Sequence, residues 1–284
     1  MLAQLFAISS ASLGAMFAIF TKRGLAGSNT ISGLFVSTIV MTLGFWIFAV
    51  PSLLTTRLTP VAILAFIADG VVSTVFARLF MFIAFGRVGT SVAMSVVGSQ
   101  PLFSALFAVT FLHERLTIPL LAGTVFIVLG IAILSEGNQR QDWRKRDLIF
   151  PMSAAILFGL ASVLKKMGLN EVGSPIVGSA INTGAAFLVI MVYLLFTRKK
   201  SVIKLGRGNV RDFSLAGMFQ IAMIFTSFGA IWLGNVVEVV PLINTSPLFT
   251  VFFSYFLLRE IERVTIRILA GAVLIVLGAA FVVL

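Results

Sequence analysis

Long apolar runs alternate with short polar connectors along the whole chain. Ten of these runs approach the ~20 residues that a helix needs to cross a bilayer core roughly 30 Å thick. Backbone groups in lipid must be hydrogen-bonded internally, and the runs are longer than the ~10-residue alternating strands of a membrane barrel. The pattern therefore predicts an all-α membrane protein without a soluble domain, and its ten expected transmembrane helices are 2–20, 31–50, 61–85, 91–112, 117–135, 148–166, 175–196, 213–233, 236–258 and 265–284.

Composition agrees with the membrane class and narrows the chemistry. Hydrophobic residues make up 59% of the chain and charged residues 11%, whereas about a quarter of a soluble domain is charged. The chain has no cysteine, and its one histidine is His113. Disulfides, thiolate metal sites and histidine clusters are thereby excluded, and we expect neither a metal nor a cofactor.

The formal net charge of +11 comes from Lys and Arg residues that lie between the apolar runs. They form no basic face on a soluble module, so nucleic acid is not an expected partner. Basic residues beside membrane spans favour anionic lipid. The sequence thus predicts a multi-pass protein of the cell (inner) membrane that contacts anionic lipid at its basic loops, as a monomer or a homodimer.

The second half of the chain repeats the first. GSQPLF begins at Gly98 and NTSPLF begins at Asn244, and their central prolines, Pro101 and Pro247, are 146 residues apart. After two inserted residues, the glycines of the following run also match. We predict a first repeat over 1–135, a basic linker over 136–147 and a second repeat over 148–284. Since each repeat holds five helices, an odd number, the repeats should insert in opposite orientations, as in alternating-access transporters.

The matching glycines are spaced by seven residues on the last helix of each repeat, as Gly123 and Gly130, and as Gly271 and Gly278. Small residues let helix backbones approach closely in lipid. We interpret the two pairs as packing positions, within one protomer or between protomers.

Basic residues predict the orientation of the chain, because cytoplasmic loops are enriched in Lys and Arg. The loops after the first, third, fifth, seventh and ninth helices contain sixteen of the twenty-one. Four lie on the opposite side, and they are Arg57, Arg115, Lys165 and Lys166. The basic loops should therefore face the cytoplasm, and both termini should face outward.

The doubled Pro-Leu-Phe motif, with the Leu-His-Glu-Arg-Leu-Thr turn and Ala-Gly-x6-Gly that follow its first copy, resembles the EamA-type drug/metabolite transporter superfamily. The resemblance extends over residues 2–284. It implies two inverted five-helix halves around a cavity lined by the third, fourth, eighth and ninth helices. It further implies export or exchange of amino acids, nucleotide sugars, sugar phosphates or drugs. Members of the superfamily commonly have both termini in the cytoplasm, which conflicts with the charge bias.

A substrate cavity near the bilayer midplane is the central prediction for the site. Each proline lacks an amide donor in mid-helix, beside other polar residues, which is costly in hydrocarbon unless the segment lines a cavity or packs on protein. The expected substrate-binding residues are Thr74, Arg78, Gln100, Gln220 and Asn244. The alternative is that Pro101 and Pro247 are structural kinks.

Asp69 and Arg78 are the two clear charges within an expected span, and such residues usually mark a pathway. They are nine positions apart, which places them on opposite faces of an ideal α-helix with 3.6 residues per turn. We expect Arg78 to face the cavity, where it would bind a carboxylate or phosphate. The alternative is that Arg78 snorkels or bonds to backbone. Asp69 and Glu238 are candidates for proton coupling. The alternative for Glu238 is an acidic residue in the first turn of a helix, where the helix dipole stabilises a negative charge.

The sequence is compatible with three classes of function. A secondary transporter that moves a small anionic or zwitterionic metabolite, such as an amino acid, by alternating access and acts as an exporter agrees best with the repeat and the sparse intramembrane polarity. A multidrug or cationic-compound exporter, and a channel or non-transporting subunit, are the alternatives. An enzyme is disfavoured because no Gly-x-Ser-x-Gly, His-Glu-x-x-His or paired intramembrane aspartate occurs.

Overall fold

The computed structural model describes residues 1–88, 90–135, 144–197, 204–257 and 266–283, and within these ranges it contains helices and no strand. Six of its helices are long and apolar enough to cross a membrane, and four further apolar helices are shorter. The prediction of a helical membrane protein is thus supported, whereas the count of ten spans stays a prediction.

Within the described residues, helical elements number eight in the first half of the chain and seven in the second. Those of the first half are α1 (Leu2–Leu25), α2 (Thr30–Thr55), α3 (Pro60–Asp69), the π-helix η1 (Gly70–Ala77), α4 (Arg78–Val88), α5 (Thr90–Val97), α6 (Gln100–Leu112) and α7 (Ile118–Ser135). Those of the second half are the 3₁₀-helix η2 (Lys145–Leu148), α8 (Ile149–Val172), α9 (Pro175–Thr197), α10 (Arg207–Leu233), α11 (Val236–Ile243), α12 (Ser246–Leu257) and α13 (Ile266–Val283).

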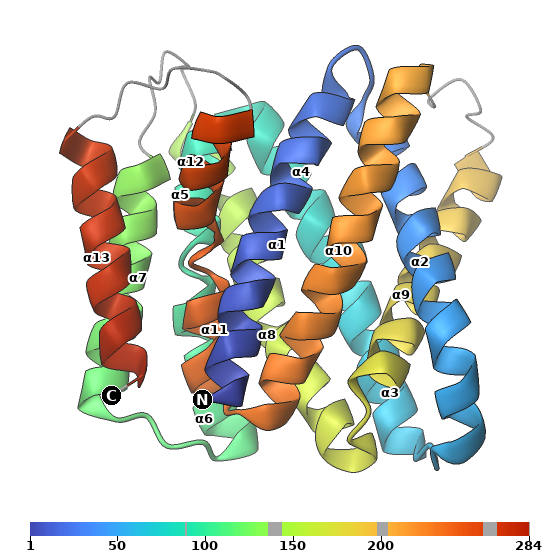
Figure 1. Ribbon diagram of the computed structural model, residues 1–284, viewed down its shortest axis with the longest axis horizontal. Coiled ribbons are helices and arrows are strands. Elements are labelled where there is room, and N and C mark those ends of the chain that lie inside the picture. The colour runs from blue at the N-terminus through green and yellow to red at the C-terminus, as the bar shows by residue number, and fades with distance from the viewer. Residues whose placement is uncertain (89, 136–143, 198–203, 258–265, 284) are drawn as a thin grey trace.

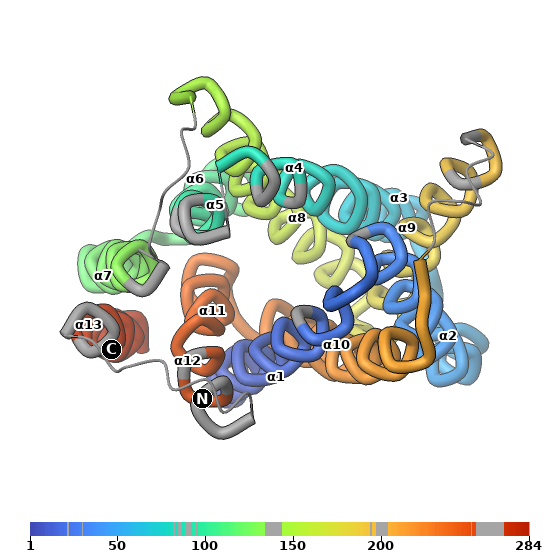
Figure 2. The backbone as a smooth tube through the Cα atoms, turned by 90° about the horizontal axis from the view of Figure 1, so that it is seen from above, coloured from blue at the N-terminus to red at the C-terminus, as the bar shows by residue number. Residues whose placement is uncertain are grey.

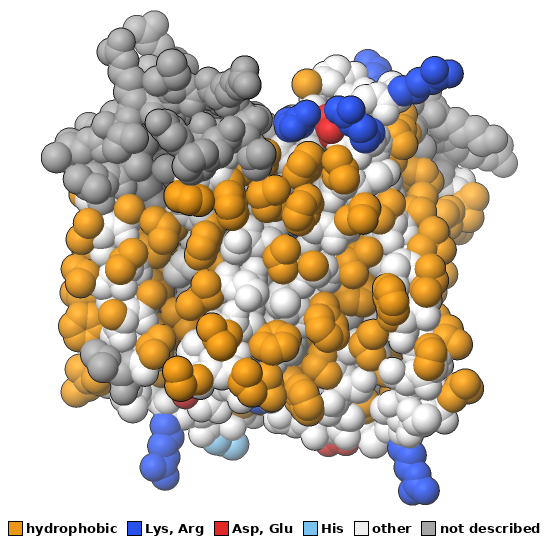
Figure 3. Space-filling view, in the orientation of Figure 1, with side chains coloured by type: hydrophobic (Ala, Val, Ile, Leu, Met, Phe, Trp, Pro, Cys, Tyr) orange, Lys and Arg blue, Asp and Glu red, His pale blue; other side chains and the backbone are white. Residues whose placement is uncertain are grey.

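The helices stand side by side in one elongated bundle, with α7 and α13 at one end and α2 and α9 at the other (Figures 1 and 2). The two halves pack against each other throughout: α1 lies on α10, α6 on α8, and α2 on α9 and α10. On the face shown in Figure 3, hydrophobic side chains cover the middle, and the Lys and Arg side chains lie at the upper and lower edges. This distribution suits a protein surrounded by lipid.

Two of the expected spans are interrupted at equivalent points. The span expected at 91–112 is divided into α5 and α6 by a turn at Gly98 and Ser99, and the span expected at 236–258 is divided into α11 and α12 by a turn at Asn244 and Thr245. Each proline is the second residue of the helix after the turn, where a missing amide hydrogen costs little because no intrahelical acceptor is available. The prolines therefore mark helix starts rather than bends within continuous helices.

The two turns use the same backbone hydrogen bonds. The amide of Ser99 donates to the carbonyl of Val96 at 3.0 Å, and the amide of Thr245 donates to the carbonyl of Leu242 at 3.1 Å. The side-chain hydroxyls of Ser99 and Thr245 donate to those same carbonyls, at 2.6 and 2.7 Å. Since lipid offers no replacement for lost backbone bonds, a hydroxyl at this position stabilises each break.

Several helices run farther than the apolar pattern indicated. α8 continues to Val172, beyond the expected end at 166, and ends at Gly173, which has φ 64°. α10 begins at Arg207, six residues before the expected start, so the connector that we placed at 197–212 is partly helical. These ends lie beyond the apolar runs because charged and polar residues can occupy helix turns outside the hydrocarbon.

The glycine pairs bring α7 and α13 into direct backbone contact within one protomer. A Cβ atom on Gly123 would lie 2.6 Å from the carbonyl oxygen of Gly278, and one on Gly130 would lie 2.8 Å from the carbonyl oxygen of Gly271. Because the earlier glycine of one helix meets the later glycine of the other, the two helices run antiparallel. The packing interpretation of these glycines therefore holds within the chain.

We expect Gly123→Val to destabilise the protein, because its side chain would collide with backbone that cannot rotate away. Overpacking of this kind typically costs about 1–3 kcal/mol, and the midpoint of thermal unfolding in detergent should fall. Gly208→Ala is the matched control, since no atom lies within 4 Å of the Cβ position at Gly208. An unchanged midpoint for Gly123→Val would contradict the close contact.

The two ends of the chain lie on one side of the bundle, and the connection from α1 to α2 lies on the other (Figure 1). The charge bias thus translates into a prediction about orientation. A fluorescent protein that matures only in the cytoplasm should stay dark when fused after Leu284, whereas an exported phosphatase fused there should be active. Fluorescence from the first fusion would establish the opposite orientation, the one common in the superfamily.

Candidate functional site

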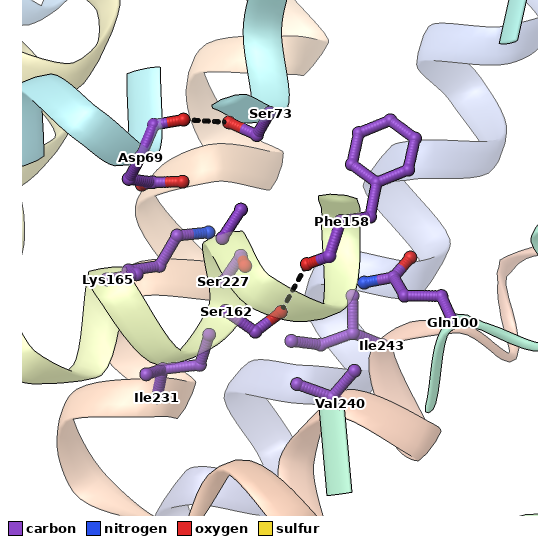
Figure 4. A pocket seen from close by; sticks show the side chains of 11 residues that line it. Asp69, Ser73, Gln100, Phe158, Ser162, Lys165, Ser227, Ile231, Val240 and Ile243 are labelled. Atoms are coloured by element: carbon purple, nitrogen blue, oxygen red, sulfur yellow. Dashed lines mark hydrogen bonds between the residues drawn. The ribbon is translucent and has the colours of Figure 1, made fainter. Parts of the chain in front are cut away.

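A cavity of about 80 Å³ lies inside the bundle. This volume is several times the ~10–15 Å³ of probe-occupied space that one water needs. Both halves of the chain line it, the first through η1, its preceding residue Asp69 and the start of α6, and the second through α8, α10 and α11 (Figure 4). The lining residues are Asp69, Ser73, Gln100, Phe158, Ala161, Ser162, Lys165, Ser227, Ile231, Val240 and Ile243.

Asp69 supplies the negative charge of the cavity. Its side chain is fully buried, and its Oδ2 accepts a hydrogen bond of 2.7 Å from Nδ2 of Asn182 in α9. Its Oδ1 is buried and has no hydrogen-bond partner among the described residues. Ser73, one turn along η1, donates its hydroxyl to the backbone carbonyl of Asp69 at 2.7 Å (Figure 4). One carboxylate oxygen is therefore fixed and the other remains available.

Lys165 supplies the positive charge. It extends from α8 toward the part of the cavity that Asp69 lines (Figure 4). Its Nζ lies 4.4 Å from the ring centroid of Phe228 in α10, a cation–π contact. No ion pair within 4.0 Å joins Lys165 to a carboxylate among the residues that the structure describes. The cavity thus holds two opposite charges that attract each other without direct contact.

The expected span 148–166 puts Lys165 at its end, on the side of the termini. The run 148–166 ends in two lysines, which resembles a helix end at the membrane surface. The helix instead continues for seven residues past Lys165, or about 10 Å at 1.5 Å per residue. Gly173 and Pro175 were the signal available in the sequence, because glycine commonly follows a helix end and proline begins the next helix.

Neighbouring Lys166 has a different role. Its Nζ donates to the backbone carbonyls of Ile231 and Gly234, at 2.8 and 2.9 Å. These groups lie at the end of α10, where helix carbonyls lack intrahelical partners. Lys166 therefore caps a helix, and it does not line the cavity.

The expectation that Asp69 and Arg78 lie on opposite helix faces assumed an uninterrupted α-helix, and the structure departs from it. The eight residues between them form a π-helix, in which hydrogen bonds run from i to i+5. Such a helix has more than four residues per turn, so nine positions make about two turns instead of two and a half. Asp69 and Arg78 are thereby brought toward the same face.

Arg78 is nevertheless not a lining residue of the cavity. With the Gln220 amide assigned so that its oxygen faces the guanidinium, Oε1 of Gln220 accepts hydrogen bonds from both Nη1, at 3.0 Å, and Nη2 of Arg78. Gln220 is fully buried in α10, and Thr74 is buried in η1 nearby in sequence. No carboxylate forms an ion pair with Arg78 within the described ranges. The permanent partner of Arg78 is thus a neutral amide.

The remaining candidate residues are divided between the cavity and its surroundings. Gln100 lines the cavity at the start of α6. Asn244 lies at the equivalent break, but its Nδ2 donates to the carbonyl of Val240 in its own helix, at 2.9 Å. Glu238 lies in the first turn of α11, where its Oε1 accepts from Nδ2 of Asn235 at 2.8 Å. Pro101 and Pro247 begin the helices that follow the two breaks.

Sequence reasoning missed the contributions of α8 to the cavity. Phe158, Ser162 and Lys165 are spaced by four and three positions, which places them on one face of the helix. An isolated serine in an apolar run carries little signal, because Ser can bond to the carbonyl four residues earlier. Ser162 does so, donating to the carbonyl of Phe158 at 3.1 Å.

These features define the chain as an all-helical, multi-pass membrane protein with a charged cavity between two similar halves. It belongs to the EamA-like transporter family, whose model matches residues 1–136 and 146–284. The resemblance seen in the sequence is thereby confirmed.

The chain is similar in fold to several solved structures, among them one described as a crystal structure of a protein, with a TM-score of 0.77 and 18% sequence identity. The match covers 98% of this chain and 95% of the other. A search of curated proteins finds no match.

The Arg78–Gln220 pair can be tested by a double-mutant cycle. Gln220→Leu would leave a buried guanidinium without its acceptor, and losing a hydrogen bond to a charged group costs roughly 1.5–3 kcal/mol. We expect a lower unfolding midpoint for Gln220→Leu and for Arg78→Leu, and a loss in the double variant smaller than the sum of the two. Met218→Leu, at an exposed position of the same helix, is the control. Strictly additive losses would show that the two side chains do not interact.

Proposed function

We propose that this protein is a secondary transporter that moves a small anionic or zwitterionic metabolite, such as an amino acid, across the cell membrane by alternating access, in the direction of export. Membership of a transporter family supports the general class. The observation that carries the proposal is the cavity lined by both halves and containing the buried carboxylate of Asp69 and the half-buried ammonium of Lys165. Buried ionisable groups within a membrane bundle usually mark a substrate or ion pathway.

The proposed architecture is that of two five-helix repeats, over 1–135 and 148–284, inserted in opposite orientations and joined by a basic linker at 136–147. The antiparallel contact between α7 and α13, which are equivalent in the sequence repeat, supports this arrangement. The equivalent breaks before α6 and α12 support it as well. In such proteins the substrate site lies where the repeats meet, and interrupted helices contribute to it.

The cavity contributes the groups that such a substrate needs. Lys165 offers an ammonium to an anionic group, and the available Oδ1 of Asp69 offers an acceptor to an ammonium or hydroxyl. Gln100 adds an amide, while Ile231, Val240 and Ile243 form an apolar wall. We place substrate binding at these residues, with Arg78, Thr74, Gln220 and Asn244 as candidates for a second polar region that the substrate meets on its way.

Export of cationic compounds is the second candidate. The observation that favours it is that the cavity is lined by both the buried carboxylate of Asp69 and the aromatic ring of Phe158, because carboxylates and aromatic faces both attract organic cations. The position of Lys165 opposes it, since a cation that entered the cavity would meet a second positive charge in a region of low dielectric constant.

Flux in proteoliposomes tests the transporter proposal. The wild-type protein should accumulate a radiolabelled substrate against its concentration gradient when a proton or solute gradient is imposed. Asp69→Asn removes the charge and keeps the shape, so we expect at least a tenfold loss of flux with normal assembly. Glu171→Gln, at an exposed carboxylate that bonds to Thr59, is the matched control and should transport normally. Flux that only dissipates gradients would identify a channel.

A further inference from the structure

The charges of Asp69 and Lys165 are arranged to leave a place between them. Both side chains line the same cavity, yet no ion pair joins them. Asn182 fixes one oxygen of Asp69, and the ring of Phe228 lies against the ammonium of Lys165. Each charge is therefore positioned by another residue, and the two are not held by each other.

The cost of removing charges from water determines which ligand fits between Asp69 and Lys165. Removing a charge from water costs several kcal/mol unless it is paired and hydrogen-bonded. The Oδ1 atom of Asp69 has no hydrogen-bond partner among the described residues, and the side chain is fully buried. A ligand with an ammonium at one end and an anionic group at the other would satisfy both charges at once. A simple cation would satisfy Asp69 and repel Lys165, and a simple anion would do the reverse.

Arg78 does not compete with Lys165 for the anionic group of such a ligand. Its guanidinium is already bound by Gln220, and it does not line the cavity. Lys166 does not compete either, because its ammonium caps the end of α10. Among the residues that line the cavity, Lys165 carries the one positive charge.

We propose that Lys165 is the residue that sets the charge selectivity of the cavity: its ammonium binds the anionic group of a zwitterionic solute while Asp69 binds the solute's ammonium, and it excludes solutes that carry only positive charge. This inference rests on the proposed transport function and makes it specific. Because selectivity depends on one side chain, neutralising Lys165 converts a site for zwitterions into a site for cations.

Matched pairs of probes test this selectivity directly. Each pair consists of an amino acid and the amine that lacks its carboxylate: alanine with ethylamine, valine with isobutylamine, leucine with isoamylamine, and phenylalanine with phenethylamine. Dissociation constants are measured by calorimetry on the purified full chain in lipid nanodiscs. The wild-type protein should prefer the amino acid in at least one pair, and Lys165→Gln should shift that preference toward the amine by at least tenfold.

Lys166→Gln is the control, because it removes a lysine from the neighbouring position without changing the charge of the cavity, and it should keep the wild-type preference. If Lys165→Gln fails to assemble, Asp69→Asn combined with Lys165→Gln removes both charges of the cavity. That double variant should bind amino acid and amine with equally weak affinity. An unchanged preference in either Lys165 variant overturns the proposal.

Two further outcomes separate this inference from the proposed function. If the wild-type protein binds neither member of any pair but transports another solute in proteoliposomes, the zwitterion assignment is wrong and the transporter proposal stands. If it binds the amino acid and shows no uphill flux, the selectivity of the cavity is upheld and the transporter proposal fails.

Discussion

Water is scarce between helices that lie in hydrocarbon, so each polar group in this bundle must find a partner within the protein. Most of the structure described above follows from that constraint. Serine and threonine hydroxyls bond to the carbonyls at the helix breaks, Lys166 caps the end of α10, and Gln220 binds Arg78. Six buried side-chain atoms of the described residues have no hydrogen-bond partner, and Oδ1 of Asp69 is the one among them that belongs to a residue lining the cavity, which points to a ligand there. A polar group without a hydrogen-bond partner is costly in such surroundings, and a ligand in the adjacent cavity would supply the missing partner.

The same constraint explains why the fold class could be predicted from the sequence and the site only in part. Run length and the shortage of charged residues are properties of whole segments, and lipid imposes them strongly. The doubled proline motif indicated two irregular points in mid-helix, expected as kinks or cavity walls, and the structure has breaks there with each proline near a helix start. The glycine spacing indicated close packing, and the contact between α7 and α13 has that form.

The failures came from assuming ideal helices. The expectation that Arg78 and Asp69 lie on opposite faces assumed 3.6 residues per turn throughout the span. No residue in Gly70–Ala77 indicates a π-helix from the sequence alone. The expected helix ended just after Lys165 because a lysine pair after an apolar run is typical of a membrane boundary, whereas α8 continues to Val172. Pairing of Arg78 in α4 with Gln220 in α10 depends on tertiary packing between the two halves, which a single sequence does not encode locally. Tertiary packing decides these points.

The π-helix between Asp69 and Arg78 also fixes the register of everything that follows it. Each residue of an α-helix turns the chain by about 100°, so the wide turns of Gly70–Ala77 act like a small adjustment in angle between α3 and α4. A return to α-helical bonding over the same residues would leave Asp69 beside Asn182 but turn the guanidinium of Arg78 to the opposite face, away from Gln220. The two polar regions of the bundle are thus aligned by the width of one stretch of helix, and a change that made this stretch α-helical without changing its length would uncouple them while sparing the hydrophobic pattern of the span.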